Sequence, residues 1–93
     1  MNLWGNEIGD VSVVRHMPNL EVAGLTVNHI GTLEDFQYCT KMRELYLRGN
    51  VIPADIAQLR YLQHLPNLRI LNLQSNPIST LPYFRTIAIK LLP

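Results

Sequence analysis

The sequence predicts an α/β solenoid in which short parallel strands line a concave face and 3₁₀ or α-helical segments form the convex face. Two observations lead to this fold class. A pattern of alternating leucines followed by an asparagine recurs about every 22 residues along the 93-residue chain. After each asparagine, apolar residues follow at intervals of three, which is typical of a tight helical return with one buried side. Each copy of the pattern therefore predicts one strand and one return.

Residues 45–52 form the clearest copy of the pattern. The alternating Leu45 and Leu47 fit a short strand with one buried face, so the residues between and after them point the other way. Asn50 marks the turn out of the strand. Its amide both donates and accepts, so it can satisfy backbone groups of its own and of a neighbouring repeat. This L-x-L-x-x-N-x-I core is the signature of a leucine-rich repeat.

Four asparagines occupy the same place in successive copies of the core, and we predict that they form a structural ladder. They are Asn6, Asn28, Asn50 and Asn76. The first two spacings are 22 residues and the third is 26, which implies an insertion in the third repeat. Repeats of this class measure roughly 20–29 residues. We therefore predict about four repeats and a single leucine-rich repeat domain over residues 1–93.

The first two repeats carry apolar residues at matching offsets after the ladder asparagine. In repeat one they are Ile8, Val11, Val14 and Met17. In repeat two, which runs over residues 20–41, they are Ile30, Leu33, Phe36 and Cys39. We expect Cys39 to be a buried thiol that packs as a small apolar residue, because the sequence offers it no cysteine partner and no ligand-spaced neighbours.

Repeat three, residues 42–67, holds the insertion. Pro53 suits the first turn of a helix, and four apolar residues then follow at intervals of three. They are Ile56, Leu59, Leu62 and Leu65. We expect a true α-helix of two to three turns here, ended by Pro66, with His64 on its surface.

Repeat four begins at Leu68, and residues 83–92 after it have helical periodicity. This segment predicts a C-terminal cap helix. Charged residues make up only 16% of the chain, against ~25% in typical globular proteins. Because solenoids usually seal both ends with polar caps, we expect the chain to be an N-terminal fragment or short form of a longer pattern.

Composition excludes several classes of function. The net charge of +1 gives no electrostatic footprint for nucleic acid. No apolar run approaches the ~18 residues of a membrane span. The single cysteine and the absence of a glycosylation sequon favour an intracellular, cytoplasmic protein. The three histidines fall in different repeats, and no nucleophile or phosphate-loop motif is present. We therefore expect no enzyme, cofactor or metal site.

Function is then expected from a surface, namely the outward-facing strand residues of successive repeats, which align about 4.8 Å apart. The predicted rows are Trp4, Thr26, Arg48 and Gln74; then Asn2, Gly24, Tyr46 and Asn72; then Val22, Glu44 and Ile70. Trp, Tyr and Arg are enriched at binding hot spots. We predict that a protein partner contacts Trp4, Val22, Thr26, Glu44, Tyr46, Arg48, Asn72 and Gln74. In the alternative interpretation, these side chains only shield the strand backbone.

The chain resembles the SDS22-like class of intracellular leucine-rich repeats and, within it, the cilia- and flagella-associated protein 410 family. The resemblance covers most of the chain and rests chiefly on residues 2–6, 17–22, 44–50 and 65–71. It implies a non-enzymatic protein–protein interaction scaffold in the cytoskeleton, at the cilium, flagellum or basal body. It also implies a NIMA-related kinase as a candidate partner. We expect the family's C-terminal oligomerisation segment to be absent from this sequence.

Two alternative functions follow from related classes of leucine-rich repeat. One is an SDS22-like regulatory subunit of a protein phosphatase, which would need a longer concave array than four repeats. The other is a spliceosomal A-prime-like scaffold, which would copurify with ribonucleoprotein through its partner.

Overall fold

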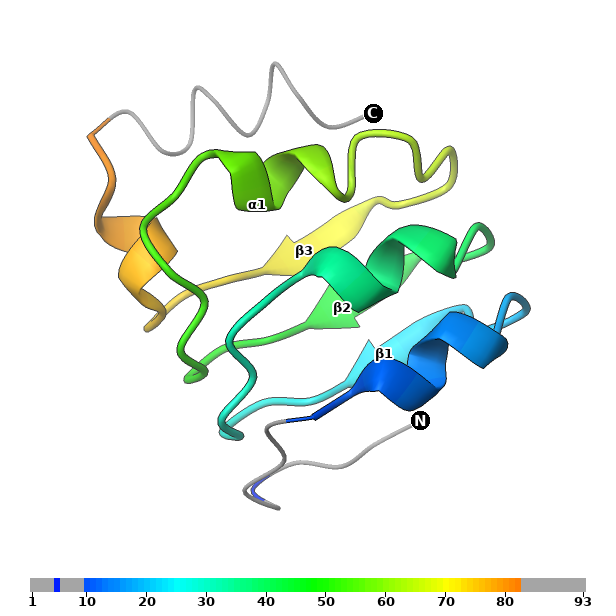
Figure 1. Ribbon diagram of the computed structural model, residues 1–93, viewed down its shortest axis with the longest axis horizontal. Coiled ribbons are helices and arrows are strands. Elements are labelled where there is room, and N and C mark those ends of the chain that lie inside the picture. Colours follow the sequence, from blue (N-terminus) through cyan, green and yellow to red (C-terminus); the bar gives the residue numbers. More distant parts are fainter. Residues whose placement is uncertain (1–4, 6–9, 83–93) are drawn as a thin grey trace.

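The computed structural model describes residue 5 and residues 10–82. Three strands, β1 (Val22–Gly24), β2 (Glu44–Tyr46) and β3 (Ile70–Asn72), pair in parallel in the order β1-β2-β3. The helical segments are η1 (Ser12–His16), η2 (Glu34–Tyr38), α1 (Ala57–Arg60) and η3 (Pro77–Thr80), of which all but α1 are 3₁₀ helices. In Figure 1 the strands lie side by side, and η1, η2 and α1 are stacked in the same order in a second layer.

The strand register aligns equivalent positions of successive repeats. Gly24, Tyr46 and Asn72 pair across the sheet, as do Val22, Glu44 and Ile70. Both rows match the predicted alignment. Backbone hydrogen bonds carry the pairing beyond the strands, because Val27 donates to the Arg48 carbonyl at 2.7 Å and Gly49 to the Gln74 carbonyl at 3.0 Å. The Gly5 amide likewise donates to the Thr26 carbonyl at 2.9 Å.

The core lies between the sheet and the helical layer. It is filled by the inward side chains of the strands and by the apolar residues of the returns. Leu45, Leu47 and Phe36 are fully buried, and each such side chain stabilises the fold by roughly 1.5–3 kcal/mol. Cys39 is also fully buried, and its thiol donates to the Val14 carbonyl at 3.4 Å. Burial also raises the pKa of this thiol, and the prediction of a buried thiol that packs as a small apolar residue is confirmed.

The inserted segment of repeat three differs from the expectation. The α-helix α1 has only four residues, and turns continue from residue 61 to 64. The amide of Leu62 donates to Leu59, and that of Leu65 to Leu62, both at 3.1 Å. These are 3₁₀-type bonds. Since the apolar residues are spaced by three, a winding of three residues per turn keeps them all over the core, whereas a longer α-helix would rotate them away.

Each ladder asparagine is preceded by a residue with left-handed backbone conformation. Two of these are glycines, Gly5 with φ 69° and Gly49 with φ 74°. The other two are Val27 with φ 57° and Ser75 with φ 58°. A β-branched residue such as Val27 adopts this region only under strain. The position before the asparagine therefore adopts the left-handed conformation in each repeat, even where the residue type disfavours it.

Two predicted elements lie outside the described residues. They are the first strand, with Trp4 and Asn6, and the cap helix over residues 83–92. The count of about four repeats and the cap therefore stay predictions. No helix in the described part of the chain is long and apolar enough to cross a membrane.

Candidate functional site

The buried asparagines in the turns link the backbones of adjacent repeats by hydrogen bonds. Asn50 is 4% exposed, and its side-chain amide donates to the carbonyls of Leu25 at 3.0 Å and Leu47 at 2.9 Å. Its side-chain oxygen accepts from the Ile30 amide at 3.0 Å. One side chain therefore satisfies backbone groups in its own repeat and in the preceding one.

Asn76 makes the same set of bonds one repeat later. It accepts from the Ile52 amide at 3.1 Å and donates to the carbonyls of Leu47 at 2.8 Å and Leu73 at 3.1 Å. Asn28 donates to the Leu25 carbonyl at 2.9 Å. These side chains are 3–4% exposed. Because the polar atoms of the asparagines face the backbone, they are not offered to a partner.

The other side of the sheet faces away from the core, and we call it the open sheet face. Its described residues are Val22, Gly24, Thr26, Glu44, Tyr46, Arg48, Ile70, Asn72 and Gln74. Val22 and Ile70 are 37% and 39% exposed, Arg48 and Gln74 are exposed, and the rest are half-buried. The predicted contact residues are thus brought together on one face, except Trp4, which lies outside the described residues.

Glu44 organises the end of this face where the strands begin. It accepts a hydrogen bond from the Tyr46 hydroxyl at 2.5 Å and pairs with Arg69 at 3.9 Å. The hydrogen bond to Glu44, together with burial and the negative charge of Glu44, raises the pKa of the Tyr46 phenol. Beside them Arg43 pairs with Glu21 at 3.2 Å. Charges at this end are therefore matched, and the Tyr46 ring is held in place by its hydroxyl.

Arg48 stands at the other end of the open sheet face. The aligned backbone of neighbouring repeats sets it between Thr26 and Gln74. Its side chain makes no hydrogen bond or ion pair with the residues that the structure describes. Asn72 accepts from the Gln74 amide at 3.1 Å, which fixes the turn next to it.

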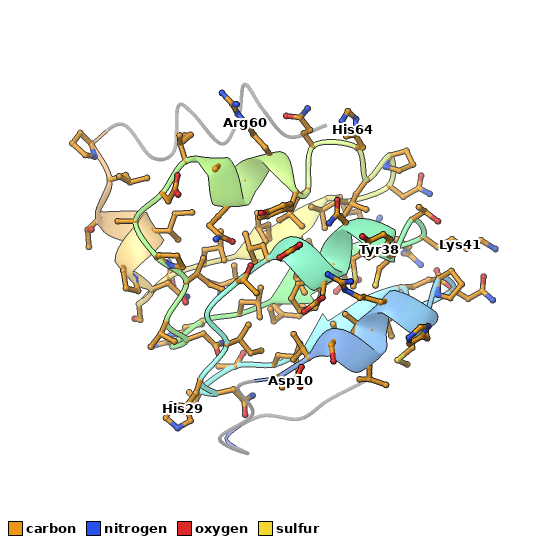
Figure 2. The ribbon with its side chains drawn as sticks, in the orientation of Figure 1. Asp10, His29, Tyr38, Lys41, Arg60 and His64 are labelled. Atoms are coloured by element: carbon orange, nitrogen blue, oxygen red, sulfur yellow. The ribbon has the colours of Figure 1, made fainter. Side chains whose placement is uncertain are left out.

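The helical layer carries a cluster of charges that sequence reasoning missed. Arg15 of η1 pairs with Glu34 at 3.5 Å and with Asp35, both on η2, and lies 5.2 Å from the centre of the Tyr38 ring. Figure 2 shows Tyr38 on this helical side. The acidic pair follows Arg15 by 19 and 20 residues, close to one repeat, and that spacing could have revealed the contact. The cluster joins repeats one and two.

The structure offers no metal-binding group of three or more suitable side chains among the described residues. His16, His29 and His64 are all exposed. His64 is exposed, and Figure 2 shows it at the upper edge of the molecule, so its predicted surface position is confirmed.

Comparison with known proteins bears on this fold directly. A family model described as "Leucine Rich repeats (2 copies)" matches residues 40–86, about half of the chain. This protein belongs to the leucine-rich repeat family. Leucine-rich repeats are built to present a surface along stacked strands, and the open sheet face of this leucine-rich repeat protein is such a surface.

Two curated relatives carry the name cilia- and flagella-associated protein 410. The human protein is 48% identical over 61 residues, which are 66% of this chain and 23% of that protein. The mouse protein is 48% identical over 54 residues, which are 58% of this chain and 22% of that protein. The matches thus span less than a quarter of the length of these relatives. The resemblance to this family is confirmed.

Solved structures confirm the leucine-rich repeat fold. An internalin (inlF) from Listeria monocytogenes matches with a TM-score of 0.74 and 21% identity, over 81% of this chain and 22% of that one. A chain of the Drosophila melanogaster SNF/U2A' complex matches with a TM-score of 0.72 and 20% identity, over 97% of this chain and 66% of that one. At such identities the likeness extends to the fold alone.

Proposed function

We propose that this protein is a non-enzymatic scaffold that binds a protein partner through its open sheet face. The observation that carries the proposal is the contrast between the asparagines buried in the turns after the strands, whose amides face the backbone, and the exposed side chains of the open sheet face. Apolar Ile70, the ring of Tyr46 and the guanidinium of Arg48 lie on one surface built from rigid, paired strands. Aromatic and arginine side chains on a rigid surface are the usual anchors of protein interfaces.

We further propose that the scaffold acts at the cilium, flagellum or basal body, within the cytoplasm and its cytoskeleton. The support is the likeness to human and mouse proteins named for cilia and flagella. The proposal takes residues 1–93 as one leucine-rich repeat domain. A NIMA-related kinase is a partner hypothesis that rests on the family resemblance alone.

A pull-down from ciliated cells tests the proposal. The bait is this chain, with a Tyr46→Ala, Arg48→Glu double variant and an Arg60→Glu control, whose exposed arginine lies on α1 in the helical layer. Circular dichroism first establishes that all three are folded. We expect basal-body or ciliary proteins with wild type and control, and their loss with the double variant.

Other outcomes point elsewhere. Equal recovery by all baits would move the binding site to the helical layer and contradict the proposed face. Recovery of a phosphatase catalytic subunit, or of ribonucleoprotein, would replace the ciliary role by one of the two alternative functions.

A further inference from the structure

The two ends of the open sheet face differ in charge. Where the strands begin, each carboxylate has a partner: Glu44 lies 3.9 Å from Arg69 and Glu21 lies 3.2 Å from Arg43. Glu44 also accepts the hydrogen bond of the Tyr46 hydroxyl. This end is therefore electrically balanced, and what it offers a partner is mainly the exposed apolar surface next to Glu44.

The end beyond the strands carries an unmatched positive charge. Arg48 is exposed and has no ion-pair partner in the described part of the chain, and its row neighbours Thr26 and Gln74 are uncharged. Glu44, at the start of β2, lies four residues back along the chain, about 13 Å away at ~3.3 Å per residue. That distance exceeds the ~8 Å Debye length at physiological ionic strength, so Glu44 does not neutralise Arg48.

We infer that the partner of this face is an acidic protein segment whose Asp or Glu carboxylate pairs with Arg48 while an apolar side chain of the same segment packs on Ile70. The inference rests on the proposed function, since it names the chemistry of the partner for the same face. A guanidinium offers two parallel N–H donors to a carboxylate. The contact therefore fixes the orientation of the carboxylate in addition to attracting its charge.

The spacing of the two contacts constrains the partner. The row of Arg48 and the row of Ile70 lie about 13 Å apart along the strands, a distance that an extended chain covers in about four residues. Tyr46 lies in the row between them, and its hydroxyl is already bonded to Glu44. The ring therefore meets the middle of the segment, and the acidic and apolar residues lie about four positions apart in the partner.

Nucleic acid does not fit this surface. Binding to a phosphate backbone uses several neutralised phosphates. Among its described residues the open sheet face offers one unmatched arginine, and the chain as a whole has a net charge of +1. A protein carboxylate, which needs one guanidinium, matches the observed charge.

The test uses a phage-displayed library of random dodecapeptides, panned against the folded chain. We expect enriched peptides to carry Asp or Glu about four positions from an apolar residue. For a synthetic peptide of the enriched sequence, Arg48→Glu and replacement of the peptide's acidic residue by Lys should each weaken binding about tenfold or more. Combining the two changes should restore most of the lost affinity, and Arg60→Glu should change nothing.

The remaining outcomes separate this inference from the proposed function. Two outcomes would overturn the inference and leave the open sheet face as the binding site. In the first, the enriched peptides lose binding with Tyr46→Ala but carry no acidic residue. In the second, combining the two charge changes does not restore affinity. Peptides that bind Tyr46→Ala and Arg48→Glu as well as wild type would overturn both. Failure to enrich any peptide would also count against the inference, while the pull-down would still decide the proposed function.

Discussion

The buried interior of the repeats and their open sheet face follow opposite rules. Inside, one residue type recurs: Asn28, Asn50 and Asn76 are buried at equivalent positions and make equivalent bonds. Outside, a single row holds Gly24, Tyr46 and Asn72, three residues with nothing in common. The turn of each repeat leaves the same backbone groups to be hydrogen-bonded, so the same residue type serves in each. A binding surface has no such constraint, and its side chains can differ from repeat to repeat. Repetition in this sequence therefore indicates structure, and variation at repeated positions indicates where recognition can occur.

The largest expected loss of stability comes from removing a buried asparagine. Asn50→Ala leaves the Ile30 amide without its acceptor and removes one of the two side-chain donors to the Leu25 carbonyl, which keeps its bond from Asn28. Because an unsatisfied buried group costs roughly 1–3 kcal/mol and each lost hydrogen bond adds about 1 kcal/mol, we expect a loss of about 3 kcal/mol in the free energy of unfolding. Urea denaturation measures it. The matched control is Asn67→Ala, an exposed asparagine, for which we expect a change within about 0.5 kcal/mol. Equal midpoints for the two variants would contradict a structural ladder.

A smaller loss of stability should follow when Gly49, in the turn of repeat three, is replaced by valine, the residue at the same position in repeat two. Gly49 has φ 74°, and a Cβ there would lie 3.3 Å from a methyl group of Val27. Gly49→Val therefore adds left-handed strain and a close contact. We expect it to lower the free energy of unfolding by about 2 kcal/mol, measured by urea denaturation. An unchanged midpoint would mean that the turn can relax out of the left-handed region.

The reverse exchange should stabilise the fold. Val27 has φ 57° and is 48% exposed, so its side chain contributes little burial to offset its strain. Asn is tolerated in this backbone region, so Val27→Asn should gain about 1 kcal/mol. Thermal unfolding should show an increase of about 4–8 °C, the shift expected per kcal/mol for a domain of this size. A decrease would show that the valine packs against its neighbour more than its exposure indicates.

On the outside, a substitution should affect binding more than stability. Tyr46 is half-buried, and among the described residues its hydroxyl bonds only to Glu44, which lies on the same strand. We expect Tyr46→Ala to change the free energy of unfolding by about 1 kcal/mol or less. Affinity for a partner recovered in the pull-down should fall about tenfold. Comparable losses in stability would place Tyr46 with the structural residues and blur the contrast between the two sides.

The smallest effect concerns pH. The hydrogen bond to Glu44 raises the pKa of Tyr46 above that of an unfolded tyrosine, about 10. The protonated phenol is therefore favoured in the folded state, so this contribution to stability is complete below pH ~10 and is lost as pH rises through the folded pKa. Tyr46→Phe should remove that alkaline loss. The unfolding midpoint as a function of pH for both proteins measures the difference, and parallel curves would contradict it.

The residues that could be predicted from sequence are those that repeat. The alternation of Leu45 and Leu47 and the phase of the asparagines predict the strands, their register and the residues of the open sheet face. The winding of the insertion was mispredicted, because an apolar stripe spaced by three was given to an α-helix although it suits a 3₁₀ return. The pair of Arg43 with Glu21, 22 residues earlier, could have been read from the repeat length.

The unmatched charge of Arg48 could not be predicted in the same way. Whether an exposed arginine has a partner depends on which side chains of adjacent repeats reach it, and long flexible side chains are not fixed by register. Sequence reasoning placed Arg48 on the open sheet face, and the structure adds that Glu44, the nearest carboxylate along the chain, is already paired with Arg69.

The bonds of the ladder also give the array an order of dependence. Asn50 accepts from Ile30 and donates to Leu25 of the repeat before it, and Asn76 does the same for Ile52 and Leu47. Each repeat is thus completed by its successor. Truncation from the C-terminal side would orphan buried backbone groups in the repeat that remains, whereas truncation from the N-terminal side would leave an asparagine that can turn to water. Unfolding should therefore begin more easily at the N-terminal end than at the C-terminal end.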